Sequence, residues 1–153
     1  MLDPMEVIQT EAQPAAVIRC TIPREEIGQV MGSAIAETIA AATSQGIGPA
    51  GPVFSNHFRL EPEIFDFEVG VPVTGELTPV GRVVASELPA RRVVRTVYTG
   101  PYEGLGAAWG EFMSLIEDAG HERGQGIFER YLTDPNTVED ASQYRTELNC
   151  PIL

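Results

Sequence analysis

The sequence predicts an α+β domain in which one strand–helix–strand–strand unit occurs twice in tandem. Two apolar stripes have helical spacing, each follows an extended stretch rich in β-formers, and each precedes two more such stretches. The length of 153 residues favours a single domain over residues 1–153, with one copy at about 5–73 and the other at about 80–153. We expect the two copies to pair about a pseudo-two-fold axis, as an antiparallel sheet with two helices and a groove between the repeats.

Two amphipathic helices are expected, over residues 24–45 and 101–119. Apolar or small residues recur in both at helical spacing, which predicts one buried face. Pro101 suits a first helical position, and Gly46 and Gly120 suit helix ends.

Four glycines lie inside these helices, and each weakens a helix by about 1 kcal/mol relative to alanine. We expect close approach of the helices to a sheet to compensate for them. The four are Gly28, Gly32, Gly106 and Gly110.

Six stretches are predicted to be strands because they are rich in β-branched and aromatic residues. They are residues 15–22, 52–58 and 65–72 in the first copy, and 91–98, 126–132 and 144–151 in the second. The last strands match at an offset of 79 residues (144−65, 147−68, 151−72), and Phe54 matches Phe128 at an offset of 74 (128−54). These offsets indicate a tandem duplication joined near residues 74–80.

The charge balance limits the partners of the protein. The net charge is −12, from ten basic and 22 acidic residues. Binding to nucleic acid requires basic residues that neutralise phosphates, so we expect neither nucleic acid nor an anionic membrane surface as a partner. A negative field favours cationic ligands or basic protein partners. The alternative is that the acidity only keeps the protein soluble.

The cysteines and the N-terminus indicate a cytoplasmic protein without a metal or cofactor. Cys20 and Cys150 lie far apart in apolar runs, as expected of buried thiols in a reducing compartment. His57 and His121 are isolated, so no metal-ligand spacing appears. Residues 1–10 lack the features of a signal peptide, and no stretch approaches 18 apolar residues.

Several motifs of the second copy are similar to one known family. They are Val97–Glu103, Trp109, Ile127–Pro135, and Tyr144–Glu147 with Pro151. The chain resembles the gyrase-inhibitor-like (GyrI-like) small-molecule-binding domain, which is also the effector-binding domain of AraC- and MerR-type bacterial regulators. The resemblance implies the duplicated fold found above, a ligand in the groove, and a glutamate at the position of Glu147 on the groove floor. Phe128 departs from the family, which often has tryptophan there.

The residues expected to bind a ligand are carboxylates in the middle of strands, aromatic residues at the ends of matched elements, and the single tryptophan on the apolar stripe of the second helix. A carboxylate that faces a groove can pair with a cation or donate a proton, and aromatic faces hold organic cations. The alternative is a solvated carboxylate for each glutamate and core packing for each ring. The predicted ligand-binding residues are Glu147, Glu68, Trp109, Tyr131, Phe128, Tyr102, Phe54, His57 and Tyr144, with Glu147 and Tyr131 as candidate catalytic residues. Glu129, in contrast, lies on the opposite strand face from Phe128.

Three functions remain open at this stage. The first is a stand-alone protein that binds an apolar or cationic small molecule such as a drug or toxin. The second is a hydrolase acting on strained-ring electrophilic cytotoxins, in which a glutamate and a tyrosine act as acid and base. The third is an inhibitor that binds a protein such as a topoisomerase. The sequence does not determine the oligomeric state.

Overall fold

The computed structural model describes residues 2–60, 63–134 and 137–153. Within them the chain forms two compact units, and the chain passes from one to the other twice. The central unit is residues 11–90, and the C-terminal unit is residues 91–153 together with the N-terminal residues 2–10.

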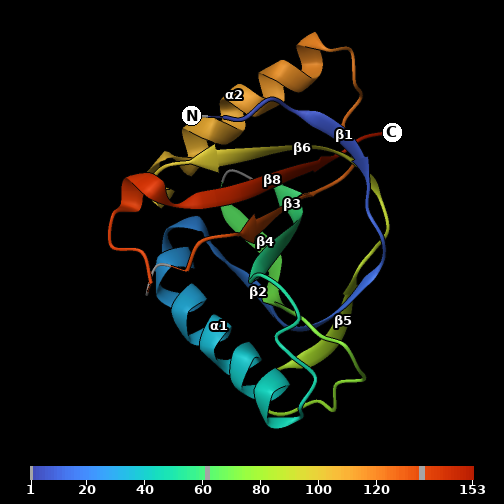
Figure 1. Ribbon diagram of the computed structural model, residues 1–153, viewed down its shortest axis with the longest axis vertical. Coiled ribbons are helices and arrows are strands. Elements are labelled where there is room, and N and C mark those ends of the chain that lie inside the picture. The colour runs from blue at the N-terminus through green and yellow to red at the C-terminus, as the bar shows by residue number, and fades with distance from the viewer. Residues whose placement is uncertain (1, 61–62, 135–136) are drawn as a thin grey trace. The chain divides into compact units, whose positions relative to one another are not determined.

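The central unit is a four-stranded antiparallel sheet with one helix (Figure 1). The strand order is β3 (Phe54–Leu60), β4 (Ile64–Pro72), β2 (Gln13–Pro23) and β5 (Val84–Leu88). A short 3-10 turn, η1 (Arg24–Glu26), leads from β2 into helix α1 (Ile27–Ser44), which packs against β2 and β4.

The C-terminal unit repeats this arrangement. Its strand order is β7 (Ile127–Tyr131), β8 (Arg145–Pro151), β6 (Arg92–Thr99) and β1 (Glu6–Gln9), all antiparallel. The 3-10 turn η2 (Tyr102–Gly104) precedes helix α2 (Leu105–Asp118), and η3 (Ala141–Gln143) precedes β8. The strand order is the same in both units, which confirms the predicted α+β duplication.

The strand registers place two glutamates at equivalent positions. Glu68 of β4 lies opposite Arg19 of β2 and Asn56 of β3. Glu147 of β8 lies opposite Val97 of β6 and Arg130 of β7. The predicted offsets of 79 (147−68) and 74 (130−56) therefore hold in three dimensions.

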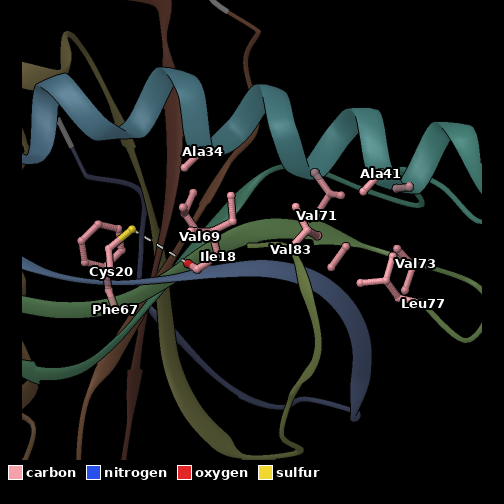
Figure 2. Packing of buried hydrophobic residues seen from close by; sticks show 12 residues of the cluster. Ile18, Cys20, Ala34, Ala41, Phe67, Val69, Val71, Val73, Leu77 and Val83 are labelled. Carbon is pink, nitrogen blue, oxygen red and sulfur yellow. Dashed lines mark hydrogen bonds between the residues drawn. The ribbon is translucent and has the colours of Figure 1, made fainter. Parts of the chain in front are cut away.

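Each helix packs on the sheet face opposite to these glutamates. In the central unit, Ala34 and Ala41 of α1 lie over Ile18 of β2 and over Val69 and Val71 of β4 (Figure 2). Side chains alternate along a strand, so Glu68 points to the other face. In the C-terminal unit the larger residues Phe112 and Ile116 of α2 pack on Leu148 and Cys150 of β8, and Glu147 again points away.

The compensation expected for the helix glycines is wrong. A Cβ atom added at Gly28, Gly32, Gly106 or Gly110 would meet nothing within 4 Å, so these positions face open space rather than a sheet. The close approach occurs instead at Gly70 of β4, where an added Cβ would lie 2.0 Å from the carbonyl oxygen of Ala16 on β2.

Replacing Gly70 by alanine is expected to lower the free energy of unfolding by about 1–3 kcal/mol, because the backbone of β2 must move to relieve the clash. Gly110→Ala is the matched control, since the same methyl group enters open space on an exposed helix position. It should raise the stability by about 0.5–1 kcal/mol. Urea denaturation of both variants measures the difference, and equal effects at both positions would contradict the packing seen around Gly70.

Both cysteines are buried, as predicted, and both are free thiols in the structure. No helix among the described residues is long and apolar enough to cross a membrane.

Candidate functional site

A buried carboxylate surrounded by aromatic side chains lies in the C-terminal unit. It is Glu129 of β7, and only 8% of the residue is exposed. Strand alternation puts Glu129 and Tyr131 on the same face of β7, the face that α2 covers, and Trp109 reaches Glu129 from α2. Tyr102 of η2 and Tyr144, directly after η3, complete a group that we call the Glu129 cluster: Tyr102, Trp109, Glu129, Tyr131 and Tyr144.

Two short hydrogen bonds hold the carboxylate within this cluster. The indole Nε1 of Trp109 donates to Glu129 Oε2 at 2.6 Å, and the hydroxyl of Tyr131 donates to Glu129 Oε1 at 2.7 Å. The two donors reach different oxygens of the carboxylate, so each oxygen of Glu129 accepts a hydrogen bond from an aromatic side chain.

The aromatic rings form a continuous set beside the carboxylate. The Tyr102 ring lies edge-on to Tyr131, with the centroids 6.1 Å apart, and is tilted against Tyr144 at 5.2 Å. Tyr102 is 37% exposed, so the set extends from the buried carboxylate to the solvent. Burial raises the pKa of the Tyr102 hydroxyl, and the nearby Tyr144, Asp134 and Glu129 raise it further, so this ring is neutral at neutral pH.

Negative charge next to aromatic faces is suited to an organic cation. The faces attract a cation through their quadrupole, by about 0.5–2 kcal/mol for each good contact, and the carboxylate adds a full opposite charge. Glu129 and Tyr131 also place a base beside a proton donor, and general acid–base catalysis uses these two kinds of group.

Glu147 does not share a sheet face with Tyr131 and Trp109, the residues predicted to bind a ligand together with it. Tyr131 lies opposite Thr146, whereas Glu147 lies opposite Arg130, so Glu147 and Tyr131 point to opposite faces of the sheet. Phe128 does share the face of Glu147, but Trp109 does not. Glu147 is not an unpaired carboxylate either, because Arg95 Nε and Arg130 Nη1 each lie 3.2 Å from its Oε1.

Glu68, the equivalent residue of the central unit, has a different environment. The hydroxyl of Ser86 on β5 lies 3.0 and 2.9 Å from its two carboxylate oxygens. Arg19, which is opposite Glu68, forms a bidentate pair with Asp66 at 2.8 and 3.0 Å instead. Burial raises the pKa of Glu68, and the Ser86 hydrogen bond and the charge of Arg19 offset this only in part.

We expect Glu68→Gln to stabilise the protein at pH 7. A carboxyl group whose pKa is raised by folding contributes stability that is complete below its unfolded pKa and is lost as the pH rises through its folded pKa. At pH 7 the charged form therefore carries a cost that glutamine removes, so the melting temperature should rise. The advantage should vanish below about pH 4, where wild-type Glu68 is protonated. Thermal unfolding from pH 3.5 to 8 measures it, and a variant less stable than wild type at pH 7 would show that Arg19 outweighs burial.

The remaining predicted residues lie in packed surroundings. His57 is 7% exposed and stacks on Phe67, with the ring centroids 5.0 Å apart. Phe54 is 1% and Phe128 3% exposed. Of the nine predicted ligand-binding residues, the Glu129 cluster brings together Trp109, Tyr131, Tyr102 and Tyr144.

The Glu129 cluster is not repeated in the central unit. The offset of 74 places Ser55 at the position of Glu129 and His57 at that of Tyr131 (129−74, 131−74). The two prolines that start the helices, Pro23 and Pro101, are 78 residues apart, which places Met31 at the position of Trp109 (109−78). Only the C-terminal unit therefore combines an acid, an indole and a phenol at this place.

Comparison with known proteins identifies the family. A family model described as the GyrI-like small molecule binding domain matches residues 3–153. The chain belongs to this family. The resemblance found in the sequence is thereby confirmed, and this GyrI-like chain is a small-molecule-binding domain by family. No curated protein sequence matches it.

Solved structures agree with the GyrI-like fold. The C-terminal domain of EcmrR is 17% identical, with a TM-score of 0.80 over 98% of this chain and 97% of that chain. SAV2435 bound to tetraphenylphosphonium is 12% identical, with a TM-score of 0.74 over 99% of this chain and 94% of that one. A hydrolase from Listeria innocua is 14% identical, with a TM-score of 0.62 over 97% and 91%. At these identities the likeness establishes the fold alone.

One of these relatives is larger than the GyrI-like domain. EcmrR in its complex with DNA is 16% identical to this chain and superposes on it with a TM-score of 0.80. The present chain covers 57% of the length of that EcmrR chain.

Proposed function

We propose that this GyrI-like protein binds a lipophilic organic cation, such as a drug or toxin, at the Glu129 cluster. The observation that carries the proposal is the Glu129 carboxylate, which is 8% exposed and held at 2.6 and 2.7 Å by the indole of Trp109 and the phenol of Tyr131. A carboxylate with two aromatic donors and further rings offers both the charge and the flat apolar surface that such a cation needs.

Two further facts support a cationic ligand. SAV2435, which has the same fold, is bound to tetraphenylphosphonium, a cation with four phenyl rings. The net charge of −12 gives this protein a negative field, which raises the local concentration of cations and speeds their association.

A pair of ions with nearly the same shape and opposite charge tests the proposal. Tetraphenylphosphonium and tetraphenylborate should be titrated separately into the protein and followed by calorimetry at fixed ionic strength. The cation is expected to bind at least tenfold more tightly, a difference of about 1.4 kcal/mol. Equal affinities, or a preference for the borate, would contradict binding at a carboxylate.

A second candidate function is the hydrolysis of a strained electrophilic ring. The hydrogen bond between Tyr131 and Glu129 favours it, since the carboxylate could take a proton from water while the phenol protonates the leaving atom of the opened ring. Two solved structures of the same fold are those of hydrolases from Listeria innocua. Incubation with an epoxide or aziridine, followed by mass spectrometry, should then yield the ring-opened product with one added water, and Tyr131→Phe should no longer form this product.

A further inference from the structure

A second charged cluster lies in the C-terminal unit, on the sheet face that points away from α2 and from the Glu129 cluster. Arg95 of β6 and Arg130 of β7 flank Glu147 of β8, and Asn149 lies beside them. Arg95 Nε lies 3.2 Å from Glu147 Oε1 and donates to Asn149 Oδ1 at 2.7 Å. Arg130 Nη1 donates to the two oxygens of Glu147 at 3.2 and 3.3 Å, and Asn149 Nδ2 donates to Oε1 at 3.1 Å.

This cluster carries an excess of positive charge. Two guanidinium groups share one carboxylate, and arginine does not lose its proton in proteins, so the local charge is +1. Glu6 of β1 lies opposite Arg95 in the register, but it is exposed to water, which screens its charge. The excess is notable in a chain of net charge −12 whose ten basic residues are all arginines.

Arg91 extends the positive charge on this side of the sheet. Its guanidinium carbon lies 5.2 Å from the centroid of the Phe128 ring, and Phe128 lies opposite Asn149 on the same face. Burial lowers the pKa of Arg91. An anion placed near these groups would offset part of the cost of removing them from water.

The two central arginines retain hydrogen-bond donors. The terminal nitrogens of Arg95, and Nε and Nη2 of Arg130, have no hydrogen-bond partner among the residues that the structure describes. The side chains of Arg95 and Arg130 are 20% and 32% exposed, whereas the side chain of Glu147 is 9% exposed. The arginine donors are therefore more accessible to an anion from solvent than the Glu147 carboxylate is. Guanidinium groups match carboxylates and phosphates with two parallel hydrogen bonds.

We propose that Arg95 and Arg130 form an anion subsite, which takes the carboxylate or phosphate group of a small molecule. Glu147 orients both guanidinium groups, and its own charge weakens the attraction to the incoming anion. The subsite is separate from the cation site proposed above because the two lie on opposite faces of one sheet.

NMR signals of the arginine Nε–Hε groups test the proposed anion subsite directly on the intact protein. Inorganic phosphate and benzoate should be titrated separately, with sodium chloride keeping the ionic strength constant. The signals of Arg95 and Arg130 should shift and reach saturation with at least one of the two anions. Saturation with phosphate or with benzoate identifies phosphate or carboxylate as the preferred group. Arg82, which pairs with Glu37 in the central unit, is the control and should not follow them. Equal shifts of Arg82, or no saturation with either anion, would overturn the proposal.

Two variants separate binding from a purely structural role. Glu147→Gln removes the negative charge that competes with the anion, so a folded variant should bind the preferred anion roughly tenfold more tightly. If the two arginines serve only to pair with Glu147 in the fold, the anion affinity should not rise. Arg130→Lys keeps the positive charge that pairs with Glu147 but loses the bidentate guanidinium group, so anion binding should weaken about fivefold or more. Unchanged anion affinity in Arg130→Lys would overturn the proposal even if Glu147→Gln does not fold. Phosphonium binding should be the same in Arg130→Lys as in wild type, which keeps this test independent of the cation site.

Discussion

Replacing Glu129 by glutamine is expected to weaken tetraphenylphosphonium binding by about 10- to 100-fold, which corresponds to about 1.4–2.8 kcal/mol. The substitution keeps the shape of the side chain and an oxygen that accepts from Trp109 or Tyr131, but it removes the charge next to the aromatic rings. Calorimetric titration of wild type and variant measures the change.

Glu103→Gln is the matched control for this substitution. Glu103 lies in η2 of the same unit and is exposed, so the variant loses the same formal charge away from the buried carboxylate. It should change the affinity less than twofold. If both variants lose the same affinity, the overall charge attracts the cation and Glu129 has no special role.

Replacing Glu147 by glutamine is expected to lower the free energy of unfolding by about 2–3 kcal/mol. Removing one partner of a fully buried ion pair costs about 3–5 kcal/mol, and the exposure of the two arginines reduces this figure. The loss arises because Arg95 and Arg130 remain partly buried and close together after their shared carboxylate is neutralised. Urea denaturation at pH 7 provides the measurement.

Glu68→Gln is the natural comparison, because Glu68 occupies the same register position in the central unit. The two variants should change stability in opposite directions at pH 7. A neutral or stabilising Glu147→Gln would show that the two arginines do not depend on this carboxylate for charge balance.

Most of the fold could be predicted from the sequence because its long elements have strong periodicity. Both helices and six strands lie within a few residues of the predicted ranges, although the first turn of each helix is a 3-10 turn. The strands β1 and β5 were not predicted. They have four and five residues, too few for a clear alternation, and they form through pairing with β6 and β2.

The candidate site could be predicted only in part. Tyr131, Tyr102 and Tyr144 were predicted from their positions at the ends of matched elements, and Trp109 was predicted from the resemblance to the family. Glu129 was not predicted as the acid of the site, because the first copy has a serine at its position, whereas Glu147 repeats Glu68. A usable signal was present, since Glu129 and Tyr131 are two residues apart and must share a strand face. The pairing of Glu147 with two arginines could not be predicted, because it depends on the register of β6, β8 and β7.

The indole Nε1–H of Trp109 allows the most direct test of cation binding at the Glu129 cluster. This is the only tryptophan, so its signal in a nitrogen–proton correlation spectrum needs no assignment, and its proton points at the Glu129 carboxylate. On titration with tetraphenylphosphonium, we expect this signal to shift along the calorimetric binding curve and to show nuclear Overhauser effects to the phenyl protons of the ligand. Saturable binding of the phosphonium with an unchanged Trp109 signal would place the cation elsewhere and contradict the proposed function.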